Sequence, residues 1–454
     1  MESPNSKRHK SSEDQDMISN LPDFISGRIL SLLPTKDAVR TSVLSKSWTY
    51  KWTFITNLHF EDHTGPYYCT KIRKDLFVSF VNRVLLRLNS SSIQSFSLAI
   101  SDEYEPLHVD QWISAVVSRK LKKLCVNSKF QLQTLSSHSL MKYKSLEELV
   151  LNVLQCEIDV PTFALFSSLT VLNLSGVQFS VITSNKSGNV HLNFPVLRTY
   201  TTSNCTWSSN VKCVTLQAPL LQMVSIHDYS YPTNIPYPTI KCCAPRLTEL
   251  SYDGYPFPDL IMFDLSAAYN IASADICIGF YKKESLQKIM ALSIKILKQF
   301  PNVKRLRFQK WLSPVLLAKG SLTDLPSFEK LSFLQLGGDV TCEILMALLL
   351  KTPYLKTLIF QDLLQSDQEL LNYDPVPGCF LNTLQVVEFR WFDGSEHQLN
   401  FAKFAMENAV ALKRMTLFSN WKLHGSKLEE VKEMLSSFKK KCSSFMSLEF
   451  SSAP

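Results

Sequence analysis

Glycine is scarce in this chain, at 12 of 454 residues. Nucleotide-binding loops need glycine to bring the backbone close to phosphate, and neither G-x-G-x-x-G nor G-x-x-x-x-G-K-[ST] occurs. The hydrolase motifs G-x-S-x-G and H-E-x-x-H are also missing, and the nine histidines have no triad or ligand spacing. A lone histidine such as His227, in a strand pattern, is interpreted as hydrogen-bonded structure. We therefore expect no catalysis, no cofactor and no bound metal.

Signals for secretion, membrane insertion and zinc binding are missing as well. The eleven cysteines are odd in number, and none is spaced as C-x-x-C or as a zinc ligand. The amino terminus lacks the apolar core of a signal peptide, and no apolar run is long enough to span a bilayer. We expect reduced, mostly buried thiols, no membrane association, and a location in the cytoplasm, the nucleus or both.

Charge is modest and dispersed. The formal net charge is +8, and hydrophobic residues make up 45% of the chain against 19% charged, which is typical of a globular protein of two or three domains. Because the positive charge forms no sustained stripe along the sequence, we expect no nucleic-acid partner. Residues 1–15 form a polar tail that we expect to be disordered, with a weak nuclear-import signal at Lys7, Arg8, His9 and Lys10 as the alternative.

Three short amphipathic helical patterns lie close together in residues 16–52, DMISNLPDFISGRILSLLPTKDAVRTSVLSKSWTYKW. The first is expected to begin at Pro22 and to end before Pro34, because proline suits a helix start and disfavours helix in the residue before it. Gly27 interrupts it at a cost of about 1 kcal/mol relative to alanine. Fewer than 40 residues rarely bury enough surface to be stable alone. The pattern therefore predicts an apolar module that packs on a neighbour or a partner.

The second and third patterns follow directly. Thr35 is expected to cap the second helix, and Ser45 to cap the third. The third helix would carry Trp48 and Trp52 on one face, either as interface anchors or as part of a small local core.

This segment resembles an F-box, and specifically the plant form with Leu-Pro at the first helix and the run LPTKDAVRTSVLSK, which occupies residues 33–46 here. Phe24, Gly27 and Ser47 depart from that form. The resemblance implies an F-box domain over residues 16–62 that inserts into the C-terminal helices of a Skp-type adaptor. The adaptor contacts that it implies are Leu21, Pro22, Ile29, Leu30, Leu33, Pro34, Val39, Leu44 and Trp48.

From about residue 90 onward, apolar residues recur at positions i, i+3 and i+5 of a unit of about 27 residues, within the range of leucine-rich repeats. Positions i+3 and i+5 share one face of a strand, and stacked units bury that face. The alternative is an α/β domain with coincidental Leu-x-x-Leu pairs. The units at Leu197 and Ile271 are weak, with Thr202 at i+5 and Ala274 at i+3. The first positions are Ile93, Leu121, Leu146, Leu169, Leu197, Leu221, Leu247, Ile271, Val303, Leu331, Leu355, Leu384 and Leu412.

An F-box followed by irregular leucine-rich repeats resembles a large plant family whose members often end in an FBD region. Residues 381–453 resemble that region through LNTLQVVEFRWFDGSEHQLNFAKFAMENAVALKRMTLF. The predicted fold class is α/β, with a three-helix F-box before a curved leucine-rich-repeat solenoid. Residues 75–380 would form the repeats, with parallel strands on the concave face and helices and irregular segments on the convex face. A helix over residues 428–441 would close the end.

Arginines concentrate at strand positions that should point away from the buried face. They predict a cluster that binds an acidic or phosphorylated segment of a target protein, because the planar guanidinium fork suits carboxylate and phosphate. The alternative is ordinary charge on a solvated sheet. The candidate substrate-binding residues are Arg305, Arg307, Arg390 and Arg414.

The family resemblance implies a non-catalytic substrate receptor of a Skp–cullin–F-box ubiquitin ligase, which reaches a cullin through the adaptor. Two alternatives stay open: a scaffold that binds the adaptor without delivering targets, and an F-box receptor that senses a small molecule. The identity of the target protein is not readable from the sequence.

Overall fold

The computed structural model describes most of the chain. The described residues are 21–62, 71–132, 145–159, 166–181, 188–228, 238–254, 261–263, 270–278, 294, 297–300, 302–309, 325–337, 340–361, 364–365, 375–420, 423–442 and 447–452. The predicted disordered tail, residues 1–15, lies outside them. The chain divides into unit 1, residues 1–131 and 138–146, and unit 2, residues 132–137 and 147–454.

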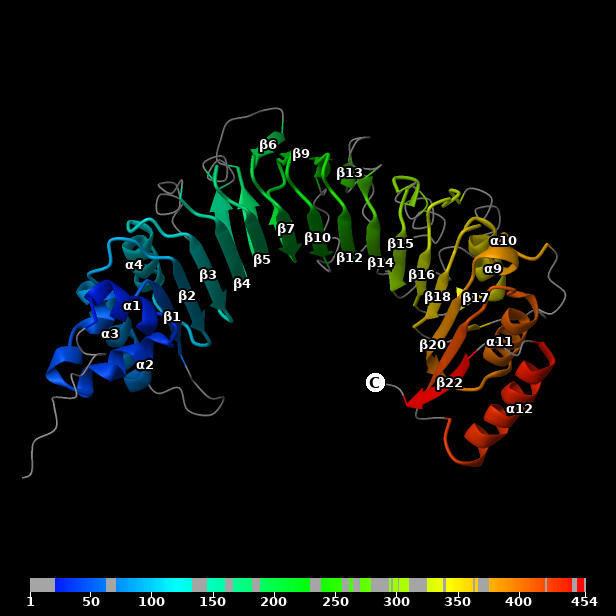
Figure 1. Cartoon of the computed structure of the whole chain (residues 1–454). Coiled ribbons are helices and arrows are strands. Elements are labelled where there is room, and N and C mark those ends of the chain that lie inside the picture. The colour runs from blue at the N-terminus through cyan, green and yellow to red at the C-terminus, as the bar shows by residue number, and fades with distance from the viewer. Residues whose placement is uncertain are drawn as a thin grey trace, which may run out of the picture. The chain divides into compact units, whose positions relative to one another are not determined.

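Unit 1 begins with short helices and continues as alternating strands and helices (Figure 1). Its strands are parallel and pair in the order β1, β2, β3. Helices α3 and α4 pack through Phe77 and Trp112, whose ring centroids lie 5.9 Å apart. The elements are α1 Asp23–Leu30, α2 Thr35–Arg40, the 3-10 helices η1 Thr41–Val43, η2 Lys46–Trp48 and η3 Lys51–Phe54, β1 Asn57–Glu61, α3 Lys71–Arg87, β2 Ser95–Ile100, α4 Pro106–Val117 and β3 Lys123–Ser128.

The first two predicted helices are present, with their ends shifted. Pro22 and Pro34 each stand just before a helix. Thr35 does not cap α2: it is the first helical residue, and its hydroxyl accepts a hydrogen bond of 2.7 Å from the backbone N–H of His59. This bond ties α2 to β1.

The prediction of a third α-helix is wrong. Two separate 3-10 turns, η2 and η3, replace one α-helix, so the i, i+4 argument for a shared face does not apply. Trp52 is buried and donates its indole N–H to the carbonyl of Thr49, whereas Trp48 is half-buried.

Gly27 has a structural reason that the sequence did not show. A Cβ at this position would lie 2.4 Å from the carbonyl oxygen of Phe54 and 2.6 Å from its Cβ. Glycine therefore allows α1 and η3 to touch backbone to backbone. What looked like a flaw in a helix is the contact point of the N-terminal module.

Unit 2 contains a large parallel sheet whose strands follow the chain order (Figure 1). The described pairs between consecutive strands are parallel. Most are in matching register, so that Leu250 lies beside Ala274 and Ala274 beside Leu306, while β4–β5 and β20–β21 each contain a register shift. The strands are β4 Glu148–Asp159, β5 Val171–Ser180, β7 Thr199–Ser203, β10 Met223–Asp228, β12 Glu249–Gly254, β14 Ser273–Ile278, β15 Arg305–Gln309, β16 Phe333–Leu336, β18 Thr357–Phe360, β20 Val386–Phe392, β21 Arg414–Ser419 and β22 Ser447–Ser452.

The repeat pattern correctly located β4 to β21 of these strands, whereas β22 lies beyond the last predicted unit, at Leu412, and was not predicted. In β12 the i+3 and i+5 residues, Leu250 and Tyr252, are buried, and the weak unit at Ile271 still forms β14 with Ala274 and Ile276 inside. The α/β class with a large parallel sheet is confirmed. The in-register stacking is consistent with the predicted leucine-rich-repeat solenoid.

Additional strands and helices pack on the main strands. A second parallel sheet, in the order β13, β11, β9, β6, was not predicted, and β8 Thr206–Trp207 pairs with β5.

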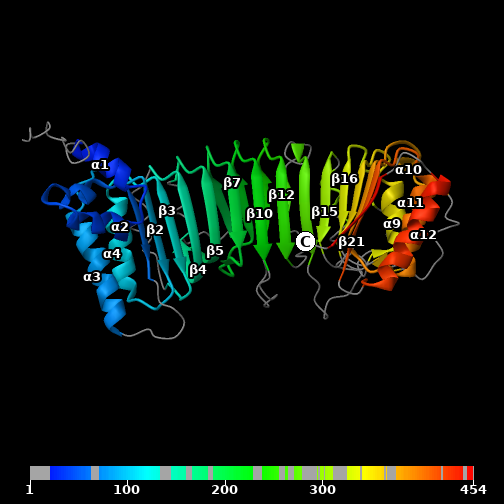
Figure 2. The same cartoon turned by 60° about the horizontal axis from the view of Figure 1, so that its bottom comes forward.

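At the C-terminal end, helices α9 to α12 lie on one side of β18 to β22 (Figures 1 and 2). The predicted closing helix is present as α12. The remaining elements are β6 Asn189–Asn193, β9 Cys213–Gln217, β11 Thr239–Cys243, β13 Ile261–Phe263, β17 Val340–Thr341, α9 Cys342–Leu350, β19 Leu364–Gln365, α10 Gly378–Asn382, α11 Glu396–Asn408 and α12 Ser426–Cys442.

Aromatic side chains fill the core under the C-terminal helices. Phe401 of α11 meets Phe360 of β18 edge-to-face, with ring centroids 5.1 Å apart, and Phe360 stacks on Phe389 of β20 at 4.9 Å. Such pairs stabilise a core beyond the area that they bury. No helix among the described residues has both the length and the apolarity needed to cross a bilayer.

We predict that Gly27→Ala destabilises the protein by about 1–3 kcal/mol, because the added methyl group overlaps the Phe54 backbone and the two segments must separate. Urea unfolding of the full chain measures the change. Gly378→Ala is the control, since nothing lies within 4 Å of a Cβ built there. Equal urea midpoints for the two variants would contradict the prediction, because the α1–η3 contact would then accommodate the methyl group without loss of stability.

Candidate functional site

An exposed apolar surface covers the N-terminal module. Six large side chains from α1, the turn after it and η1 are solvent-exposed, reaching 83% at Leu32 and 84% at Val43. Exposed apolar groups concentrated in so short a segment are characteristic of a protein-interaction site. We call this surface the apolar face: Phe24, Ile29, Leu32, Leu33, Val43 and Leu44.

The module keeps these side chains outside because its own core is small. Leu30, Ala38, Trp52 and Ile55 are buried and fill that core. Helical segments this short cannot enclose a second layer of apolar side chains. The apolar face therefore consists of the apolar side chains that the folded module cannot bury.

The nine predicted adaptor contacts divide into three groups. Exposed are Pro22, Ile29, Leu33, Pro34 and Leu44, half-buried are Leu21, Val39 and Trp48, and buried is Leu30. The buried position of Leu30 makes it a core residue of the free module.

Three members of the apolar face were not among the predicted contacts. Phe24, Leu32 and Val43 lie in the same helical patterns as the predicted contacts, and the spacing alone did not separate core from surface. In helices this short, one residue of rotation moves a side chain from inside to outside.

A buried lysine fixes the start of α1. Lys51 is 6% exposed, and its ammonium donates to the carbonyl oxygen of Leu21 at 2.8 Å and to the Ser26 hydroxyl at 3.2 Å. Charged donors make strong hydrogen bonds, and burial raises their importance. Lys51 thus ties the Leu21–Pro22 dipeptide to η3 across 30 residues of sequence.

A cavity of about 710 Å³ in unit 1 adjoins the apolar face. Val39 and Val43 line one side, and Leu76, Phe77 and Phe80 of α3 line the other. Asp62, at the end of β1, also lines the cavity, and burial raises the pKa of this carboxyl although the backbone N–H groups of Ser101 and Asp102 donate to it.

Two protein families match parts of this chain, one at each end. The F-box domain family matches residues 18–53, and the FBD family matches residues 373–417. The chain carries an F-box domain and an FBD region. The apolar face lies within the F-box match, and β20, α11 and most of β21 lie within the FBD match.

Similar proteins extend over most of the chain. An F-box/FBD/LRR-repeat protein of Arabidopsis thaliana is 29% identical over 438 residues, covering 92% of this chain and 91% of the relative. An FBD-associated F-box protein of the same plant is 29% identical over 437 residues, with 92% and 96% covered. An F-box/LRR-repeat protein, also from Arabidopsis thaliana, is 25% identical over 450 residues, with 89% and 88% covered.

The four candidate substrate-binding arginines do not form one cluster. Arg305 and Arg307 lie together on β15, where their guanidinium carbons are 4.0 and 5.8 Å from the Phe333 ring centroid. Arg307 also faces Asp275 at 3.8 Å. Arg414 occupies the register position of Arg305 four strands further on, about 19 Å away at 4.8 Å per strand.

Arg390 is already engaged within the protein. Its Nε donates to Glu388 at 2.8 Å and one terminal nitrogen donates to Gln361 at 3.3 Å. Arg305 and Arg307 are therefore the pair that the fold brings together, with Phe333 as a flat platform for a cation–π contact.

His227 lies on the outward side of β10, where it forms a hydrogen bond within the strand. Its Nε2 lies 2.8 Å from the Ser225 hydroxyl, and its Nδ1 lies 3.7 Å from a carboxylate oxygen of Asp253. The second distance is too long for a hydrogen bond.

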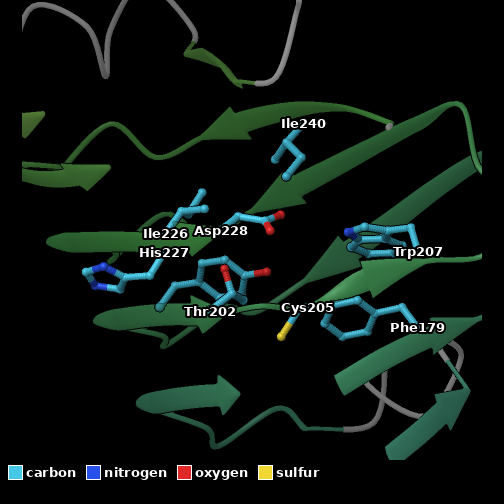
Figure 3. A pocket seen from close by; sticks show the side chains of 9 residues that line it. Phe179, Thr202, Cys205, Trp207, Ile226, His227, Asp228 and Ile240 are labelled. Carbon is cyan, nitrogen blue, oxygen red and sulfur yellow. The ribbon is translucent and has the colours of Figure 1, made fainter. Parts of the chain in front are cut away.

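A small cavity lies behind the same strand. Figure 3 shows Thr202, Cys205, Ile226 and Asp228 around it, and its volume of about 20 Å³ fits a single water molecule and no larger ligand. Among the described residues, no group of three or more histidine, cysteine, aspartate or glutamate side chains could hold a metal ion.

The reactivity of each cysteine thiol should fall as its burial increases. Burial raises the pKa of Cys205 to about 11 and of Cys379 to about 12, so both thiols stay protonated near neutral pH. We predict that iodoacetamide modifies half-buried Cys213 and Cys243 before these two. Mass spectrometry of the native chain measures the order, and labelling in urea gives the unfolded reference. Fast labelling of native Cys205 would contradict the closed core.

Proposed function

We propose that this protein is the substrate-recognition subunit of a Skp–cullin–F-box ubiquitin ligase. The F-box would bind a Skp-type adaptor and, through it, a cullin, while unit 2 would hold a target protein. The observation that carries the proposal is the apolar face, which leaves six large side chains in water unless a partner covers them. The chain itself would do no covalent chemistry and would contribute proximity between the target and the ubiquitin-loaded enzyme.

The target-binding surface is proposed to be the outward side of the unit 2 sheet. Arg305 and Arg307 would bind carboxylate or phosphate on the target, because their forks are exposed and Phe333 holds them in place. Arg390 and Arg414 belong to the same surface at greater distance. A rigid stack of in-register strands suits this role, since it holds the target at a fixed position.

Replacing apolar-face residues by charged ones should abolish adaptor binding without unfolding the chain. We expect Val43→Glu and Leu44→Glu each to weaken capture by a Skp-type adaptor at least about tenfold, because each would bury an unpaired carboxylate in the interface. Leu86→Glu on α3 is the matched control, since Leu86 is also 84% exposed but lies outside the F-box. Binding is measured by calorimetry with the purified full-length variants. Undiminished adaptor binding by both F-box variants would refute this role for the apolar face.

A second experiment separates a ligase receptor from a scaffold. Affinity capture from plant cells with the wild-type chain and with Val43→Glu should lose adaptor and cullin from the variant but retain proteins bound to unit 2. For a receptor, we expect those retained proteins to accumulate in cells that express Val43→Glu, as measured by quantitative mass spectrometry. Unchanged abundance with adaptor binding lost would favour the non-degradative scaffold.

A further inference from the structure

Unit 2 carries a row of uncompensated positive charge along the edge where its strands begin. Each repeat starts at a buried leucine, isoleucine or valine, and the residues just before and after it lie at this edge. From the repeat at Leu169 to the repeat at Leu412, these flanking positions hold six cations and no acid. We call this set the basic row: Arg198, Arg246, Lys304, Lys330, Lys356 and Lys413.

The backbone fixes the alignment of the row. A ladder of hydrogen bonds runs across the strand starts, from the N–H of Lys304 to Ala272, from Ser332 to Lys304 and from Lys356 to Ser332, and it continues through Gln385 to Lys413. Figure 2 shows β7, β10, β12 and β15 pointing the same way, so that their starts share one edge. The row spans eight strand steps, about 38 Å at 4.8 Å per step.

The cations of the row have no partners within the described chain. All six are exposed, and none forms an ion pair with a described residue. The nearest acids along the chain are Glu329, next to Lys330, and Glu249, three residues after Arg246, so six cations face two acids and the row keeps a positive excess. Successive cations lie one to two strands apart over most of the row, comparable to the screening length of about 8 Å at physiological salt, so their fields add.

Exposed apolar side chains accompany the row at its C-terminal end. Tyr354, Leu381 and Val410 lie in three consecutive connecting segments, Leu381 in α10 and the other two in turns, with exposures of 58%, 51% and 82%. These segments are joined by hydrogen bonds, from the Thr383 hydroxyl to the carbonyl of Pro353 at 3.3 Å and from the N–H of Val410 to the carbonyl of Phe380 at 3.1 Å. The apolar groups therefore lie beside Lys356 and Lys413.

We infer that this edge binds an extended acidic protein segment that also carries apolar side chains. The row supplies charge complementarity, and Tyr354, Leu381 and Val410 bury the apolar side chains of the segment. About 12 extended residues would follow the whole row at 3.3 Å per residue. Phosphates of a nucleic acid would satisfy the cations but leave Leu381 and Val410 without a role, so a protein segment fits better. This binding is separate from adaptor binding and does not require the proposed ligase function.

The test compares two triple variants of the full-length protein. Lys304→Glu with Lys330→Glu and Lys356→Glu removes the centre of the row. Lys212→Glu with Lys241→Glu and Lys427→Glu is the matched control, because these lysines are exposed, lie off the row and change the net charge equally. The probe is a fluorescent 12-residue peptide of glutamate with leucine at every fourth position, followed by anisotropy at 150 mM salt.

We expect the row variant to weaken peptide binding at least about tenfold and the control less than twofold. Leu381→Ser with Val410→Ser should weaken this peptide at least about threefold but leave an all-glutamate peptide unchanged. Equal losses in the two triple variants would overturn the inference, because net charge alone would then explain binding. Tighter row-dependent binding of a 20-base-pair DNA duplex, or of phosphatidylserine vesicles, than of the peptide would also overturn it.

Discussion

The alternation of side chains along parallel, in-register strands is the constraint on which the rest of unit 2 depends. In β15, Leu306 and Phe308 are each 1% exposed, which forces Arg305 and Arg307 to the other side. Because each strand keeps the register of its neighbour, one position in the repeat becomes one row on the surface. Side chains that are tens of residues apart in sequence thereby become neighbours, and the chemistry of unit 2 is organised by rows more than by local motifs.

The F-box module follows a different rule, set by its size. Its folding depends on a few long-range contacts, such as Gly27 against the Phe54 backbone and the Lys51 ammonium on the Leu21 carbonyl. These contacts fix α1 on η3 and leave the apolar face in water. The face costs solubility in the free chain, since it exposes side chains that a larger domain would bury. A partner that covered the apolar face would bury these side chains, which links the fold of the module to its proposed role.

Strand positions could be predicted from the sequence because each depends on a pattern within six residues. Leu250 and Tyr252 or Leu306 and Phe308 needed only their own spacing, and even Ala274 took its place because the neighbouring strands set its register. The second sheet was not predicted, because NVHLN and CVTLQ alternate as strands do but lie outside the stronger leucine pattern of the repeats. Proline disfavours regular strand and helix, so the stretches Tyr231 to Pro238 and Tyr255 to Pro258 are predicted to be irregular; they lie almost wholly outside the described residues.

Functional positions were harder to predict because they depend on distance in space. The roles of Gly27 and Lys51 rest on partners 27 and 30 residues away in sequence, which no local pattern reports. The expected arginine cluster was separated by the sheet, because Arg305 and Arg414 share a row but stand four strands apart. The basic row is the opposite case: its members are dispersed in sequence, and the stacking of the repeats aligns them along one edge.

The two kinds of surface should also act differently on a partner. Burial of the apolar face stabilises a complex by about 25 cal/mol per Å² of apolar surface and depends little on salt. The basic row acts over several ångströms before contact, so it raises association rates and orients an acidic partner, and salt weakens it. The proposed adaptor binding through the F-box should therefore persist at ionic strengths that release partners from the edge of unit 2. Ionic strength thus offers a physical means of separating the two proposed functions in one intact chain.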